Sequence, residues 1–180
     1  MSEMRETPSQ TAGPYVHIGL APAAAGLGAT VAAFGASVFP PGEPGEPLCI
    51  EGILRDGAGA PVTDALIEVR QADAAGRVRP DAGWGRVVPD FETGLWSFDT
   101  VKPGAVGGAP HIALWIVARG INLGLHTRLY LEDEASNATD PLLRRAGPRA
   151  PTLVARRIGP GLYRHEIRLQ GEGETVFLDL

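Results

Sequence analysis

The chain of 180 residues has one cysteine, few aromatic residues and no excess of basic charge. With Cys49 alone, an internal disulfide is impossible, and without a C-x-x-C pair there is no zinc or redox motif of that kind. Cys49 lies in the apolar run LCI, where we expect it to be a small core residue. Basic residues number 16 against 21 acidic ones. No basic stretch would neutralise a phosphate backbone, so nucleic acid is not an expected partner.

The sequence also lacks a convincing membrane segment. The region from Ile18 to Phe39 has no charge and exceeds the ~18 residues that a membrane helix needs. It consists mostly of Ala and Gly, with Pro22 inside, and these residues contribute far less transfer energy than Leu, Ile or Phe. The start MSEMRE is not the basic opening of a secretory signal. We expect a loose surface helix or loop here, no membrane contact and a cytoplasmic protein.

What the chain does have is glycine and proline, 24 and 16 residues, clustered between short apolar runs. This pattern predicts an all-β fold with many turns. One domain is expected over 1–180, with an N-terminal arm and variable segment at 1–47 and a two-sheet β-sandwich at 48–180. Strands are predicted at Leu48–Leu54, Ala65–Gln71, Leu95–Val101, His111–Ala118, Leu125–Leu131, Leu153–Arg157, Tyr163–Leu169 and Thr175–Leu180.

The connections give weaker signals. RDGAGAPV, after the first predicted strand, favours a hairpin turn because Asp-Gly and Gly tolerate positive φ. PDAGWGRVVPDFETG has no clear period and indicates a loop. Asp133–Arg149 is expected to hold one short helical turn and a linker.

The predicted strand His111–Ala118 is the most informative. A His-x-His strand places both imidazoles on one face, which suits a metal ion, but here Ala113 stands at the second position and His111 is alone. Apolar residues occur at both parities. We therefore expect a central strand covered by the opposite sheet on one face and by another subunit on the other.

Several longer motifs, in order along the chain, carry a family resemblance: ETPSQTAGPYVHIGL, IEVRQADAAG, TVKPG, ARGINLGLHTRLYLEDE and IRLQGEGETVF. Together they closely resemble the alpha subunits of the protocatechuate 3,4-dioxygenases, in the intradiol ring-cleavage dioxygenase family. The resemblance covers most of the chain and is weakest over Ala21–Glu46 and Arg77–Glu92.

The resemblance implies a hetero-oligomer of alpha and beta subunits, both β-sandwiches of the intradiol type with long loops. The beta subunit holds a non-haem ferric ion, Fe(III), through two Tyr and two His. The assembled enzyme uses O2 to open protocatechuate between its hydroxylated carbons, giving 3-carboxy-cis,cis-muconate in aromatic catabolism. This chain is then a subunit without catalytic residues of its own, and alone it is expected to be inactive.

Two sets of positions follow from the resemblance. The tyrosine ligands match Val78 and Val106, the histidine ligands match His111 and Ala113, and the active-site arginine matches Gly108, so no metal is expected in this chain.

The second set belongs to the alpha subunit's share of the neighbouring substrate pocket: Thr11, Gly13, Pro14, Tyr15 and Arg119. An arginine fork suits the ring carboxylate, a tyrosine hydroxyl can donate to it, and Gly-Pro gives a rigid wall.

Structural alternatives exist for these residues. Arg119 at a strand end could be a solvated surface arginine, Tyr15 could anchor the arm by packing, and His111 could be a satisfied buried histidine. Three residues share one face of a predicted strand, His126, Arg128 and Tyr130. We interpret them as part of a polar sheet face or of an interface.

Two other classes of protein remain open on the residues alone. One is a non-catalytic transthyretin-like or prealbumin-like β-sandwich that serves only as a binding module or as a spacer. The other is an independent iron or zinc enzyme, which stoichiometric metal in the purified chain would support.

Overall fold

The computed structural model describes residues 10–13, 15–22, 26–27 and 37–179. The elements in chain order are α1 (Val16–Leu20), β1 (Pro47–Arg55), β2 (Leu66–Gln71), β3 (Trp84–Val87), β4 (Leu95–Val101), β5 (His111–Val117), β6 (Leu125–Leu131), η1 (Ala135–Thr139), α2 (Pro141–Ala146), η2 (Gly147–Leu153), β7 (Val154–Gly159) and β8 (Leu162–Arg168).

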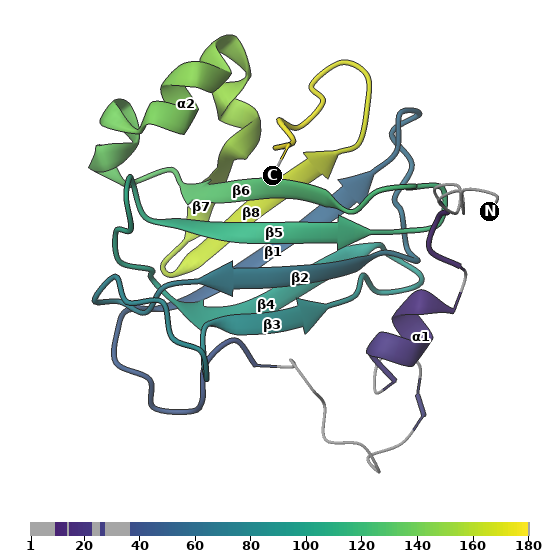
Figure 1. Cartoon of the computed structure of the whole chain (residues 1–180), viewed down its shortest axis with the longest axis horizontal. Coiled ribbons are helices and arrows are strands. Elements are labelled where there is room, and N and C mark those ends of the chain that lie inside the picture. The colour runs from purple at the N-terminus through teal and green to yellow at the C-terminus, as the bar shows by residue number, and fades with distance from the viewer. Residues whose placement is uncertain (1–9, 14, 23–25, 28–36, 180) are drawn as a thin grey trace, which may run out of the picture.

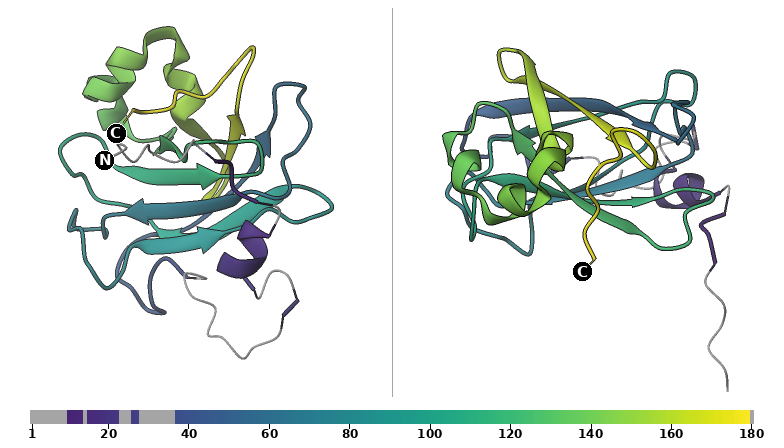
Figure 2. Two further views of the ribbon diagram at one scale, coloured as in Figure 1. Left: turned by 45° about the vertical axis from the view of Figure 1, so that its right-hand side comes forward. Right: turned by 90° about the horizontal axis from the view of Figure 1, so that it is seen from above.

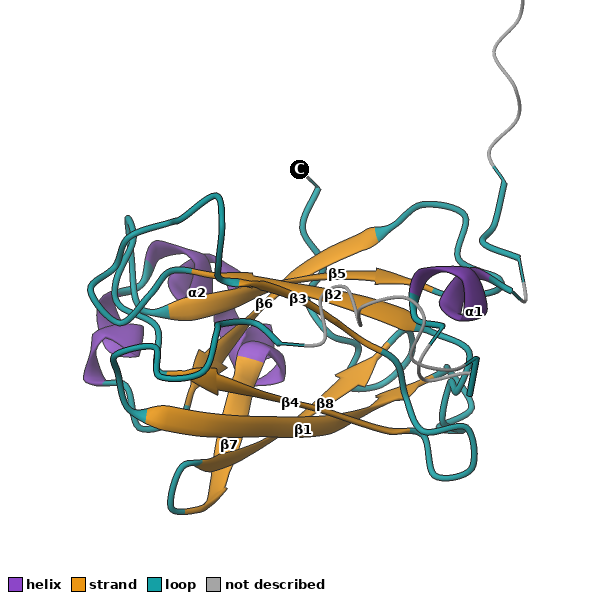
Figure 3. Ribbon diagram, turned by 90° about the horizontal axis from the view of Figure 1, so that it is seen from below, coloured by secondary structure: helices purple, strands orange, loops and turns teal. Residues whose placement is uncertain are grey.

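Two sheets face each other with the apolar core between them (Figure 3). One has the strand order β3-β2-β5-β6 and the other β7-β8-β1-β4. β7 joins the two, because it starts parallel to the end of β6 and then pairs antiparallel with β8. The two-sheet β-sandwich predicted from the sequence is confirmed.

The core forms because side chains leave a strand on alternate faces. On β1, Ile50 and Leu54 are fully buried between the sheets, and Gly52 takes the inward position between them. The indole of Trp96 lies over this glycine. A Cβ at Gly52 would come within 2.5 Å of Trp96 Cζ2 and closer still to the carbonyl oxygen of His165. A side chain there would force the strands apart, so the close packing of β4, β1 and β8 requires glycine.

Most predicted strands are confirmed. Leu95–Val101 and Leu125–Leu131 form β4 and β6 with the predicted bounds, and β1, β2, β5, β7 and β8 differ from prediction by one or two residues at an end. The strand predicted at Thr175–Leu180 is wrong. In the described part of that segment Leu178 makes an isolated bridge to His126, and no strand forms around it.

Two predictions about connections are also wrong. The segment predicted as a loop contains β3, a four-residue strand whose partner is β2. The turn after β1 does form, with Asp56 Oδ1 accepting from the N–H groups of Ala58 and Ala60 and with Gly59 at φ 86°. It does not close a hairpin, however, because β1 and β2 belong to different sheets.

The segment Asp133–Arg149 holds more helix than predicted. It contains η1, α2 and the start of η2 in place of one helical turn and a linker. Of Ile18–Phe39 the structure describes only parts, and α1 ends within it at Leu20. No helix in the described ranges is long and apolar enough to cross a membrane.

Cys49 does not lie in the core as predicted. It is half-buried on the outward parity of β1, because Leu48 and Ile50 take the inward positions on either side of it. Burial, with the carboxylate of Asp99 nearby, raises the pKa of the Cys49 thiol. The thiol is therefore protonated and a weak nucleophile near neutral pH.

β5 is covered by the opposite sheet on its inner face, where Ile112, Leu114 and Ile116 are buried. On its outer face Ala113 and Trp115 are only half-buried within the described structure. The aliphatic residues Ile112, Leu114 and Ile116 therefore point inward, whereas the large indole of Trp115 lies on the outer face. Cover of the outer face by another subunit stays a prediction.

Candidate functional site

β5 separates the two sets of predicted site positions. It begins at His111, and Arg119 is eight positions further along, two residues after its end at Val117. At about 3.3 Å per residue this separation is roughly 26 Å. Figures 1 and 2 show α2 at the end of the sandwich where β5 begins and α1 at the opposite end. The two sets cannot belong to one site within this chain.

The positions matching the tyrosine ligands lie near the α2 end, on adjoining loops. The Gly104 N–H donates to the carbonyl oxygen of Asp73 at 2.8 Å and holds the loops together. Val78 and Val106 are 59% and 42% exposed. Exposed valines offer no donor atoms to a metal and leave an apolar surface at this end.

The histidine at this end, His111, makes its contacts within the chain. His111 Nδ1 donates to the carbonyl oxygen of Ala109 at 2.9 Å, and its ring centroid lies 5.6 Å from that of Tyr130. Burial lowers the pKa of His111, so the ring is neutral near pH 7. The interpretation as a satisfied histidine agrees with this geometry, although the ring is half-buried rather than fully buried.

These residues do not fit a ferric ion. Valine and alanine have no ligand atoms, and a single imidazole supplies too few hard ligands for a stable site. Within the described residues, no three His, Cys, Asp or Glu side chains lie close enough together to hold a metal ion.

A buried carboxylate organises this end instead. Asp140 Oδ1 accepts from the N–H groups of Leu142 and Leu143 at 2.8 and 3.0 Å, and so caps the start of α2. The Tyr130 hydroxyl donates to the same oxygen at 3.2 Å, and the Ala109 N–H donates to Oδ2 at 2.9 Å. Burial opposes ionisation of Asp140, but these hydrogen bonds outweigh it and lower its pKa.

Asp140 also explains the glycine at the position that matches the family's active-site arginine. A Cβ at Gly108 would lie 2.6 Å from Asp140 Oδ2. No longer side chain can occupy position 108 unless this carboxylate moves. Asp140 was not predicted as a structural residue, although Asp followed by Pro141 is a typical helix start.

At the α1 end the structure brings Thr11 to Arg119. Thr11 Oγ1 accepts from the N–H of Gly120 at 2.7 Å and lies 3.4 Å from the carbonyl oxygen of Ala118. The N-terminal arm is thereby fastened to the backbone on both sides of Arg119.

Other arm residues are free at the surface. Tyr15 is 74% exposed, so the alternative that it anchors the arm by packing within this chain is wrong. Gly13 is exposed, and a Cβ there would meet no atom within 4 Å. Pro14 lies outside the described residues. Tyr15 is four positions from the tethered Thr11, at most about 14 Å along the chain.

Arg119 is partly held by an acidic partner. Its Nε lies 3.2 Å from Asp64 Oδ2, with the arginine side chain 66% and the aspartate side chain 25% exposed. The two Nη groups have no partner among the described residues. The role of Asp64 could not be predicted from the sequence, because a contact across 55 positions leaves no local signal.

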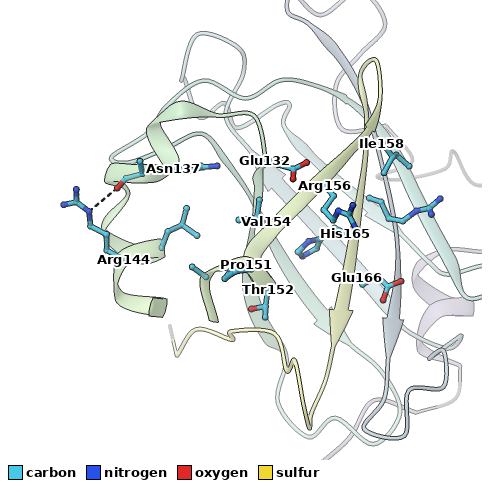
Figure 4. Close-up of a pocket in the computed structure, with 14 residues that line it drawn as sticks. Glu132, Asn137, Arg144, Pro151, Thr152, Val154, Arg156, Ile158, His165 and Glu166 are labelled. Carbon is cyan, nitrogen blue, oxygen red and sulfur yellow. Dashed lines mark hydrogen bonds between the residues drawn. The ribbon is translucent and has the colours of Figure 1, made fainter. Parts of the chain in front are cut away.

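A groove of about 940 Å³ lies elsewhere, between the helical segment and the strands β7 and β8 (Figure 4). Two of the charged residues in its walls are paired with neighbours outside it, Arg164 with Glu51 and Glu166 with Arg55. None of the predicted site residues lines it. Cavity volume alone therefore does not locate the candidate site.

Solved structures define the class of protein. The dioxygenase domain of a dioxygenase and carbohydrate-binding fusion from Streptomyces sp. SirexAA-E superposes with a TM-score of 0.62 and 28% identity, over 78% of this chain and 88% of that one. The 3-chlorocatechol 1,2-dioxygenase of Rhodococcus opacus 1CP superposes with a TM-score of 0.60 over 73% of this chain and 63% of that one; at 22% identity it supports the fold alone. The fold is that of the intradiol dioxygenases.

Sequence relatives narrow the class. The protocatechuate 3,4-dioxygenase alpha chain of Pseudomonas putida is 46% identical over 97% of this chain and 96% of its own length. That of Burkholderia cepacia is 38% identical over the full length of both. The beta chain of the Burkholderia enzyme is 33% identical over 57% of this chain and 52% of its own length. No protein-family model matches the chain. The chain belongs to the family of protocatechuate 3,4-dioxygenase alpha chains.

Similarity to protocatechuate 3,4-dioxygenase alpha chains over nearly the whole chain favours that family over the transthyretin-like binding module. The partial similarity to a beta chain agrees with two related subunits.

Proposed function

We propose that this chain is the non-iron-binding subunit of a protocatechuate 3,4-dioxygenase. It pairs with an iron-bearing beta subunit and contributes Thr11, Gly13, Pro14, Tyr15 and Arg119 to the substrate pocket of that neighbour. The assembled enzyme cleaves protocatechuate between the hydroxylated carbons with O2, and Fe(III) on the beta subunit supplies the oxygen chemistry.

The observation that carries this proposal is the separation along β5. Arg119 is eight positions from His111 and six from Ala113, which corresponds to roughly 26 and 20 Å along an extended strand. Arg119 is therefore too far away to serve a centre built at His111 of the same chain. An exposed guanidinium whose Nη groups have no partner among the described residues suits a centre that a second chain brings to this end.

The side chains at this end match the substrate. Protocatechuate carries one carboxylate, and the two Nη groups of Arg119 form a fork that pairs with two carboxylate oxygens. The hydroxyl of Tyr15 can donate to the same group. These residues bind and orient the ring, while proton and electron movements take place at the neighbouring subunit.

We expect the chain purified without its partner to cleave no catechol ring and to hold no stoichiometric iron. Val78, Val106 and Ala113 have no ligand atoms, and Nδ1 of His111 is already donating to Ala109. Metal analysis, the visible spectrum and O2 uptake with protocatechuate measure these properties. One ferric ion per chain with a tyrosinate absorption band would contradict the proposal.

Co-expression with a beta chain bearing two Tyr ligands and a His-x-His strand is the positive control. It should give a stable complex that consumes O2 and protocatechuate in equal amounts. If the two chains do not associate, the proposed pairing is wrong.

A further inference from the structure

We propose that Asp64 is a positioning residue for substrate recognition, which holds Arg119 by its Nε so that both Nη groups face the substrate carboxylate. This inference rests on the proposed function, because it assigns a supporting residue to the pocket that Arg119 enters. Asp64 precedes β2, the strand that pairs with β5.

The contact leaves the working end of the arginine open. Asp64 Oδ2 lies 3.2 Å from Nε, on the inner edge of the guanidinium, and the Nη atoms have no partner in the described structure. A carboxylate that engaged the Nη pair would compete with the substrate. One that engages Nε restrains the direction of the fork and leaves the pair free for a second carboxylate.

The backbone beneath Arg119 is also fixed. Thr11 Oγ1 accepts from the Gly120 N–H at 2.7 Å and lies within 3.4 Å of the carbonyl oxygen of Ala118. The residue therefore has one restraint on its backbone, from the arm, and a second on its side chain, from Asp64.

Restraint matters here because arginine has a long side chain. An arginine that is 66% exposed loses rotamer entropy when a ligand immobilises it. A partner that limits the rotamers beforehand lowers this cost and strengthens binding without touching the ligand. On an open surface such an ion pair adds little stability, so its effect should appear in substrate affinity.

The test is Asp64→Asn in the assembled enzyme. The KM for protocatechuate should rise roughly three- to tenfold with kcat little changed, since the interaction acts on ground state and transition state alike. Plain catechol has no carboxylate, and its KM should stay within about twofold. Asp64→Glu keeps the charge and should recover part of the affinity. A matched control is Glu166→Gln, which breaks the exposed pair of Glu166 Oε2 with Arg55 Nε at 3.3 Å and should change neither substrate.

A double-mutant cycle separates this inference from the proposed function. If Asp64 acts through Arg119, Asp64→Asn should add little to the loss already caused by Arg119→Ala. Equal losses on catechol and protocatechuate, or fully additive losses in the cycle, would overturn the positioning role. If Arg119→Ala impairs protocatechuate selectively and Asp64→Asn does not, the inference fails while the proposed function stands. If Arg119→Ala itself has no selective effect, the assignment of Arg119 fails first.

Discussion

Arg119→Ala in the assembled enzyme should weaken the apparent affinity for protocatechuate by roughly 10- to 150-fold. The substitution removes a charge-assisted pair with the ring carboxylate worth about 1.5 to 3 kcal/mol. Iron content should stay unchanged, because the proposed iron ligands belong to the beta subunit, whereas Arg119 is proposed to contact only the substrate carboxylate. Steady-state kinetics and metal analysis of the same preparation measure both quantities.

Plain catechol gives the discriminating comparison. It presents the same hydroxyl groups and has no carboxylate. The apparent affinity for catechol should therefore fall much less in Arg119→Ala than the affinity for protocatechuate. Tyr15→Phe should show a smaller loss in the same direction, because it removes one hydroxyl and keeps the ring. Equal losses on both substrates would mean that Arg119 has a structural role.

Arg156→Ala is a suitable control for this experiment. Arg156 is an exposed arginine on β7 with no partner among the described residues. Its removal changes the net charge as Arg119→Ala does. Kinetics that respond equally to both variants would indicate a general electrostatic effect and would contradict specific recognition.

The sandwich was predictable where strand periodicity reflects burial. β4 and β8 alternate between core and solvent, and β4 was predicted with its observed bounds. β3 was missed because four residues carry no measurable period. At the C-terminus an apolar pattern predicted a strand, but there the only strand-like pairing in the described chain is the bridge of Leu178 to His126. Pairing partners are a tertiary property, and a local pattern does not contain them.

The candidate site also has residues that could be predicted from the sequence and residues that could not. The resemblance supplied Thr11 and Arg119, and the structure gives them a physical link through the Gly120 N–H. Asp64 and Asp140 came only from the structure. Asp64 pairs with a guanidinium 55 positions away, and Asp140, besides capping α2 locally, accepts from the Ala109 N–H 31 positions away; neither distant contact leaves a local signal in the sequence.

Asp140 shows why the α2 end cannot simply regain an iron site by restoring ligands. Its carboxylate joins the loop before β5, the strand β6 and the start of α2. The glycine at position 108 accommodates this carboxylate. In this chain the end of the sandwich is therefore stabilised by a hydrogen-bonded carboxylate, with no need for a metal ion.

Asp140→Ala should destabilise the folded chain by about 3 kcal/mol. The change removes a helix cap, worth about 1 kcal/mol, and leaves the Ala109 N–H and the Tyr130 hydroxyl buried without their acceptor. For a chain of 180 residues this corresponds to a fall in Tm of roughly 6 to 12 °C. Thermal unfolding at matched concentration measures the fall, and hydrogen exchange at Leu142 and Leu143 should accelerate.

The effect should depend on pH and on burial. Because the folded-state pKa of Asp140 is lowered, its contribution is complete above the ordinary aspartate pKa of about 3.9 and is lost as the pH falls through the folded value. The Tm difference between wild type and Asp140→Asn should therefore narrow in acid.

Asp90→Ala is the matched control for burial, since Asp90 accepts similar hydrogen bonds from Glu92 and Thr93 in an exposed turn. This substitution should lower the free energy of unfolding by under about 1 kcal/mol. Equal losses for Asp90→Ala and Asp140→Ala would show that burial of the carboxylate adds nothing, and the proposed role of Asp140 in organising the α2 end would be wrong.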